Sequence, residues 1–145
     1  MKIAKPGGGT PTERLLSTLC ERTFLKLWSW PNPRKGDGKE LCDLLALFDD
    51  YVFIFFDREN KALQNKEKDI GVTWPRWKKD AIDKQLNTAK GAARYIRERH
   101  PVFLDTGRTQ PFPGVMPATP IIHKIIVAHG AAELCQSQAT NISGS

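Results

Sequence analysis

The amino-acid sequence predicts an α/β domain, in which a mixed β-sheet and its flanking helices form two or three layers. Three observations lead to this prediction. Two long segments, residues 11–27 and 73–99, repeat apolar residues at helical spacing. Two apolar runs, 41–48 and 51–56, are separated by a pair of aspartates, as in a β-hairpin. A further run, 121–128, is rich in β-branched residues and predicts another strand.

The size and composition are those of one globular domain. The chain has 145 residues, of which 40% are hydrophobic and 26% charged. We expect a flexible leader over 1–9, an α/β core over 10–135 and a tail over 136–145. No apolar run approaches the roughly 20 residues that cross a bilayer, and the first residues lack a secretory signal. With three cysteines and no CxxC pair, we expect a cytoplasmic protein with free thiols that does not contact membranes.

Each predicted helix carries a start signal. Thr10 fits the N-cap of the first, with Pro11 at N1 and Glu13 completing a capping box. Thr73 fits the N-cap of the second, with Pro75 near N1. The second helix also has an apolar stripe that should pack on the sheet. That stripe consists of Ile82, Leu86, Ala89, Ala93 and Ile96.

The remaining segments predict loops and one short strand. Residues 28–39 hold two prolines and two glycines, which predicts a loop with Trp28 and Trp30 at the edge of the core. Residues 60–72 are polar and predict a surface loop, and 106–120 are rich in proline and glycine. Residues 101–105 predict a short strand.

The acids of the predicted hairpin are the first candidates for function. Asp43 lies within the first apolar run, and Asp57, Arg58 and Glu59 end the second. An unpartnered buried carboxylate costs several kcal/mol or takes up a proton. These acids therefore need partners, unless Asp43 is a loop residue and the other two are solvated at a strand end.

The turn of the hairpin decides whether the acids meet. A two-residue turn would pair Phe48 with Tyr51. It would place Asp43 and Asp57 on opposite faces, because neighbouring side chains alternate. A three-residue turn with a left-handed Asp50 would shift the pairing by one residue and put both acids on one face. We predict the three-residue turn, because Asp tolerates that conformation and because it brings the acids together.

Carboxylates gathered at one end of a sheet repel each other unless a cation joins them. Oxygen ligands, with no histidine expected nearby, favour Mg²⁺ or Mn²⁺ over zinc. Such an ion polarises a phosphodiester and lowers the pKa of a bound water. The acids therefore predict a divalent metal held by Asp43 and Asp57.

The order of these acids resembles the PD-(D/E)XK nuclease superfamily over roughly residues 10–99. The shared features are Glu13 on a helix, Asp43 on one hairpin strand, and Asp57 and Glu59 as the outer residues of a triplet on the next. The resemblance implies a restriction-endonuclease-like core and a nuclease. Asp43 and Asp57 would bind Mg²⁺ or Mn²⁺, Glu13 would assist through water, and the third triplet position would orient or deprotonate the attacking water.

Two further positions bear on this resemblance. Position 59 is Glu where the family usually has Lys, although some members carry an acid there. With the two-residue turn, Arg58 would face Asp43 instead, and the triplet would lack its second acid. The family often turns a Gln or Lys of the following helix toward the active site, and Gln85 could take that place.

The second predicted helix is strongly basic. It carries eight Lys and Arg against three acids, nearly all of the net charge of +6. A basic ridge beside an acidic metal pocket suits nucleic acid, with DNA favoured, although such a ridge can also be only a solvated face. An alternative function is a non-catalytic nucleic-acid-binding or assembly module of the same fold. With either function, the chain could form a homodimer or belong to a larger assembly. The candidate nucleic-acid contacts are Lys78, Lys79, Lys84, Lys90 and Arg94.

Overall fold

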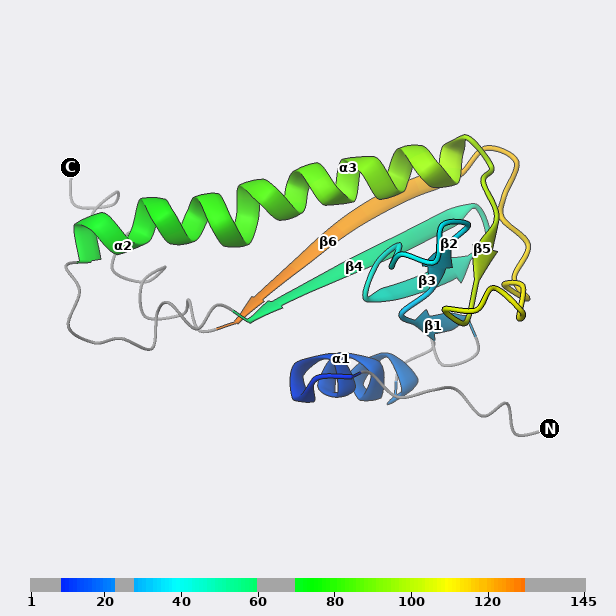
Figure 1. Ribbon diagram of the computed structural model, residues 1–145, viewed down its shortest axis with the longest axis horizontal. Coiled ribbons are helices and arrows are strands. Elements are labelled where there is room, and N and C mark those ends of the chain that lie inside the picture. Colours follow the sequence, from blue (N-terminus) through cyan, green and yellow to red (C-terminus); the bar gives the residue numbers. More distant parts are fainter. Residues whose placement is uncertain (1–8, 23–27, 60–69, 130–145) are drawn as a thin grey trace.

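A computed structural model describes residues 9–22, 28–59 and 70–129, apart from the side chains of residues 20, 21, 59 and 70–73 (Figure 1). The chain is a mixed α/β structure, as the sequence predicts. In chain order the elements are α1 (Pro11–Arg22), β1 (Ser29–Pro31), β2 (Arg34–Lys35), β3 (Leu44–Phe48), β4 (Tyr51–Glu59), α2 (Ile70–Trp77), the π-helical η3 (Lys78–Asp83), α3 (Lys84–Arg97), β5 (Val102–Phe103) and β6 (Ile121–His129).

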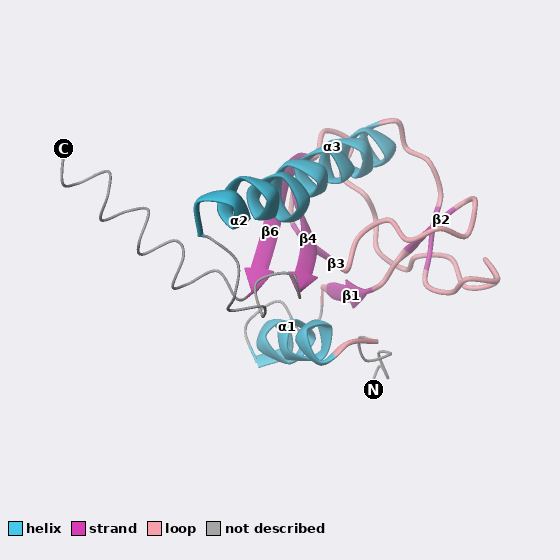
Figure 2. Ribbon diagram, turned by 60° about the vertical axis from the view of Figure 1, so that its left-hand side comes forward, coloured by secondary structure: helices cyan, strands magenta, loops and turns pink. Residues whose placement is uncertain are grey.

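A mixed four-stranded sheet in the order β1-β3-β4-β6 forms the centre of the fold. β1, β3 and β4 are antiparallel neighbours, whereas β6 runs parallel to β4. The long helical segment of α2, η3 and α3 joins these two parallel strands and covers one face of the sheet, and α1 lies on the other face (Figures 1 and 2). The arrangement therefore has three layers, which the sequence left open between two and three.

The main core lies between the sheet and α3. Alternate residues of β4, including Ile54, point into it and meet Ala89, Ala93 and Ile96 of α3. The opposite set of β4 side chains points toward α1, where Phe55 packs with Leu16. Successive side chains of β4 thus face α3 and α1 in turn.

Helix α1 begins as its sequence predicts. The amide of Glu13 donates to Thr10 Oγ1 at 3.2 Å, and the amide of Thr10 donates to Glu13 Oε2 at 3.1 Å. This reciprocal pair is a capping box. α1 ends at Arg22, and the last five residues of the predicted helix, 23–27, lie outside the described residues.

The predicted start of the second helix is wrong. Helix α2 is described from Ile70, so Thr73 is not an N-cap and Pro75 lies inside the helix. An internal proline removes one amide donor and crowds the carbonyl four residues earlier. The π-helical η3 begins three residues after Pro75, and local irregularities of this kind often lie beside a disturbed hydrogen-bond ladder.

One residue of the predicted stripe is not buried. Leu86 is 38% exposed, whereas Ala89, Ala93 and Ile96 of the same helix are buried. Gln85 lies one turn before Ala89, on the same side of the helix.

The segment predicted as a loop around the tryptophans contains β1 and β2. β1 is an edge strand of the sheet, where a proline such as Pro31 is tolerated because one side of the strand needs no amide donor. Trp30 is buried and lies edge-on to Phe112, with ring centroids 4.7 Å apart. The short strand predicted at 101–105 is β5, which pairs with β2.

The hairpin has the two-residue turn, so the predicted three-residue turn is wrong. Phe48 pairs with Tyr51, and the turn consists of Asp49 and Asp50. Asp49, rather than Asp50, takes the left-handed conformation, with φ of 52°. A positive φ at this position matches the twist of the strands without an extra residue.

None of the helices in the described part of the chain is long and apolar enough to span a bilayer.

The turn geometry can be tested by two glycine substitutions. We expect Asp49→Gly to keep or raise the melting temperature, because glycine adopts a positive φ at no steric cost. We expect Asp50→Gly to lower the free energy of unfolding by about 0.5–1 kcal/mol, because it adds only chain entropy to the unfolded state. Thermal unfolding of the two variants measures this, and the reverse order would point to the three-residue turn.

Candidate functional site

Asp43 lies directly before Leu44, the first residue of β3, and is therefore a loop residue at the end of the sheet. Its amide donates to the carbonyl of Phe55 at 3.0 Å, although Phe55 is already the pairing partner of Leu44. Because Asp43 is outside the strand, strand alternation does not fix the direction of its side chain. Asp43 Oδ2 accepts a hydrogen bond from the amide of Asp57 at 2.5 Å. The carboxylate of Asp43 thus meets the backbone of Asp57 where β3 begins, and the turn does not bring them together.

The side chain of Asp57 is almost completely buried. Its side chain is 1% exposed, and Oδ1 lies 2.5 Å from Nε2 of His129. Oδ2 is buried without a hydrogen-bond partner among the described residues. The parallel register pairs Asp57 with Val127, so His129, two residues further along β6, projects from the same face of the sheet. This face is the one that α1 covers, where Phe55 and Val127 pack together.

Asp43 lies in a crowded acidic environment. Burial raises the pKa of Asp43 to about 7, the hydrogen bond from the Asp57 amide opposes this rise, and the nearby carboxylates of Glu40 and Glu13 add to it. Among the described residues no Lys or Arg forms an ion pair with Asp43 or Asp57, whereas Glu40 has Arg34 at 3.7 Å. A cation bound here would relieve the repulsion between these carboxylates.

Glu13 lies close to Asp43 while it caps its own helix. Glu13 Oε2 accepts hydrogen bonds from the amides of Gly9 and Thr10 at 2.8 and 3.1 Å. Its carboxylate also contributes to the raised pKa of Asp43. Glu13 therefore belongs both to the start of α1 and to the acid cluster. Its capping role does not exclude a role in the cluster.

The other predicted site residues are not all brought to this cluster. Gln85 lies on α3, which packs on the face of the sheet opposite to the one from which Asp57 projects. Arg58 is exposed and points away from Asp57 by strand alternation. Because Asp43 lies outside β3, strand alternation does not turn Arg58 toward it. The side chain of Glu59 lies outside the described residues, although its backbone pairs with His129.

The five predicted nucleic-acid contacts are exposed on the helical segment. Two of them are paired with acids of the same segment: Lys84 with Asp80 at 2.6 Å, and Lys78 with Asp83 at 3.3 Å. No described acid forms an ion pair with the other three. Those three, Lys79, Lys90 and Arg94, are the residues whose charge is best placed for an external anion.

The described acids fit a divalent cation only in part. Within the described side chains, no group of three His, Cys, Asp or Glu residues is arranged to hold a metal. Mg²⁺, however, commonly takes only one or two carboxylates and completes its shell with waters and substrate phosphates. The unpartnered Asp57 Oδ2 is a suitable ligand atom for such an ion.

His129 is the site residue that the sequence did not identify. The expectation that no histidine lies near these acids is wrong, because Nε2 of His129 lies 2.5 Å from Oδ1 of Asp57. Its contact with Asp57 depends on the parallel register of β4 and β6, two strands joined through the whole helical segment. A local pattern carries no signal for that register.

Comparisons with protein-family models, with curated proteins and with solved structures found no match to this chain.

The raised pKa of Asp43 has a consequence for the metal-free protein. The pKa of Asp43 is about 7 in the folded state, whereas in the unfolded chain the carboxyl group has its ordinary pKa of 3.8. Between these values the folded state binds more protons, so the stability falls as the pH rises. We expect Asp43→Asn to remove this fall and to be more stable than wild type at pH 8, because the amide stays neutral and still accepts from the Asp57 amide.

Urea unfolding in EDTA at about pH 5 and pH 8 measures this difference. Asp50→Asn, which changes an exposed acid of the turn, should keep the wild-type pH dependence. An identical pH dependence in wild type and Asp43→Asn would contradict the expectation.

The contact between His129 and Asp57 should stabilise the fold. We expect His129→Leu to lower the free energy of unfolding by about 1–3 kcal/mol, because it leaves both oxygens of a buried carboxyl group without a described partner. His129→Gln retains a donor and should cost less than half as much. Chemical unfolding measures both, and an Asp57→Asn background should reduce the effect of His129→Leu. Equal losses in both backgrounds would assign the cost to packing alone.

Proposed function

We propose that this chain is a metal-dependent nuclease domain of the restriction-endonuclease-like type, with DNA as the favoured substrate. One observation carries the proposal. At one end of the hairpin, the carboxylate of Asp43 accepts a hydrogen bond from the backbone amide of Asp57, so the two residues are neighbours there. No described Lys or Arg forms an ion pair with either acid, although Oδ1 of Asp57 contacts His129. Oδ2 of Asp57 is left without a described partner, and carboxylate oxygens are the ligands that Mg²⁺ or Mn²⁺ prefers.

The order of the elements supports the same proposal. A helix carrying an acid precedes two antiparallel strands, with Asp43 directly before the first strand and Asp57 on the second, and a crossover helix then leads to a parallel strand. This order agrees with the restriction-endonuclease-like core that the resemblance implies. Glu13 lies near Asp43, where it could assist through a water.

The residues of the site are held in place before any ligand binds. The Asp57 amide fixes the carboxylate of Asp43, and His129 fixes Oδ1 of Asp57 while leaving Oδ2 without a described partner. Asp43 and Asp57 would hold the metal, which supplies polarisation of the phosphodiester and a more acidic bound water. Fixed ligands reduce the reorganisation needed at the moment of reaction.

An alternative is a non-catalytic nucleic-acid-binding or assembly module of the same fold. Two observations favour it. Gln85 lies on the far side of the sheet from Asp57, and Asp57 already has a partner in His129. In that module the acids would have a structural role, and the basic residues of the helical segment would provide the binding.

A nuclease assay with matched variants tests the proposal. We expect the wild type to cleave DNA with Mg²⁺ or Mn²⁺ and not in EDTA. Asp43→Ala and Asp57→Asn should each reduce the rate at least about 100-fold, because each removes one of two metal ligands. Asp50→Ala, a substitution of an exposed acid of the turn, should leave the rate unchanged, and circular dichroism should show that all variants are folded.

Two other results would decide against cleavage by these acids. Undiminished cleavage in both site variants would remove the proposal. Binding of DNA without cleavage in either metal, together with equal Mn²⁺ affinity of wild type and Asp43→Ala, would favour the non-catalytic module.

A further inference from the structure

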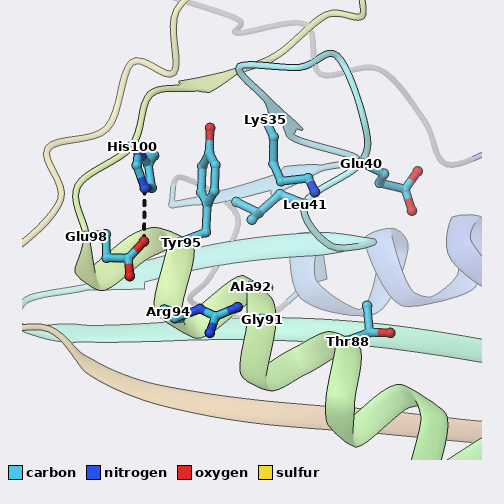
Figure 3. A pocket seen from close by; sticks show the side chains of 10 residues that line it. All are labelled: Lys35, Glu40, Leu41, Thr88, Gly91, Ala92, Arg94, Tyr95, Glu98 and His100. Carbon is cyan, nitrogen blue, oxygen red and sulfur yellow. Dashed lines mark hydrogen bonds and ion pairs between the residues drawn. The ribbon is translucent and has the colours of Figure 1, made fainter.

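A groove of about 390 Å³ lies between α3 and the segment that contains β2 and leads to β3 (Figure 3). Its polar side chains come from both sides, Lys35 from the β2 side and Arg94 from α3. Glu40 and His100 lie toward opposite ends of the groove in Figure 3. Gly91 lines the side that α3 forms.

Gly91 is an unusual residue for its place. It lies in the interior of the 14-residue α3, where glycine is among the least favourable residues. A Cβ added at Gly91 would meet no described atom within 4 Å, so no contact with the described residues requires a glycine. Its missing side chain leaves the helix surface open to the groove. Glycine is used in this way where a ligand approaches the backbone closely.

The charges around the groove favour an anion. Arg94 is exposed and forms no ion pair with a described acid. Among the described acids, Asp37 is the one that forms an ion pair with Lys35, at 4.0 Å. The two acids at the rim have basic neighbours of their own, Glu98 in His100 at 3.0 Å and Glu40 in Arg34 at 3.7 Å. One guanidinium and one ammonium group therefore remain to contact a ligand across the open surface of Gly91.

The groove is connected to the acid cluster. Glu40 lines one end of the groove and is also close enough to Asp43 to raise the pKa of that residue. A chain of phosphates that leaves the groove at this end would pass the acids directly. The basic residues of the groove suit the phosphates of a ligand. The carboxylates of the cluster suit a cation that those phosphates would contact.

We propose that this groove binds the phosphodiester backbone of a nucleic-acid strand, with Arg94 and Lys35 contacting phosphates and Gly91 keeping the helix surface open. The inference rests on the proposed function, because it makes the groove the path by which the substrate strand reaches Asp43 and Asp57. It adds a defined binding surface to the exposed basic ridge.

Substitutions at Gly91 separate binding from stability. We expect Gly91→Ala to raise the melting temperature by about 3 °C, because alanine favours the helix and meets no neighbour. Gly91→Leu should not lower the melting temperature, yet it should weaken DNA binding at least about 10-fold by filling the groove. Fluorescence anisotropy with labelled single-stranded and duplex DNA of one sequence, in EDTA, measures the affinity. Unchanged affinity of Gly91→Leu for both DNAs would overturn the inference.

A pair of arginine substitutions separates the groove from general electrostatics. We expect Arg94→Gln to weaken binding about 5–10-fold and to reduce the slope of log affinity against log salt by about 0.7–0.9, the loss of one phosphate contact. Arg97→Gln removes the same charge from an exposed position that does not line the groove, and it should change the affinity less than about twofold. Equal effects of the two substitutions would overturn the inference.

The two proposals can fail separately. Cleavage that depends on Asp43, with wild-type binding by Gly91→Leu and Arg94→Gln, would reject the groove and keep the nuclease. Groove-dependent binding without cleavage in Mg²⁺ or Mn²⁺ would support the groove and reject the nuclease.

Discussion

The hydrogen bond from the amide of Asp57 to the carboxylate of Asp43 is the interaction on which this end of the molecule depends. If β3 continued with regular pairing before Leu44, Asp43 would point toward the core that α3 covers, where an unpartnered carboxylate costs several kcal/mol. β3 instead begins at Leu44, and the carboxylate of Asp43 is directed to the amide of Asp57. Burial raises the pKa of Asp43 there, and the carboxylates of Glu40 and Glu13 add to the rise. The start of the strand thus avoids a conflict with the core and leaves Asp43 near other acids.

The sheet divides the chemistry of the chain between its two faces. On β4, Ile54 and its alternate neighbours fill the core beneath α3, whereas Phe55 and Asp57 face α1. Because β6 runs parallel to β4, it delivers His129 to the α1 face at the end where the acids lie. The same division keeps Gln85, a residue of α3, away from Asp57. Any catalytic role must therefore use residues of the α1 face and of the strand ends.

Local features of the fold could be predicted from the sequence, and features that depend on long-range geometry could not. The capping box of Thr10 and Glu13 involves four consecutive residues, so the sequence contains all of its chemistry. The exposure of Leu86 was not predicted, because the helical period gives the apolar stripe of a helix but not which of its edge residues the sheet covers. The contact of His129 with Asp57 depends on the pairing of two strands that are distant in the chain. The proximity of Asp43 and Asp57 was predicted from a three-residue turn, whereas it arises where β3 begins, because alternation does not show at which residue a strand starts.

On our proposal, the acid cluster and the groove are each incomplete alone. Two described carboxylates give a divalent cation few protein ligands, and Mg²⁺ usually fills such a shell with water and substrate phosphate. The groove offers Arg94 and Lys35 to phosphates, with Glu40 between them and Asp43. A phosphate would thus complete the ligands of the cation, and the cation would offset the repulsion between that phosphate and the acids. Metal and nucleic acid should then bind with positive coupling, each at its own site and each raising the affinity of the other by the same factor.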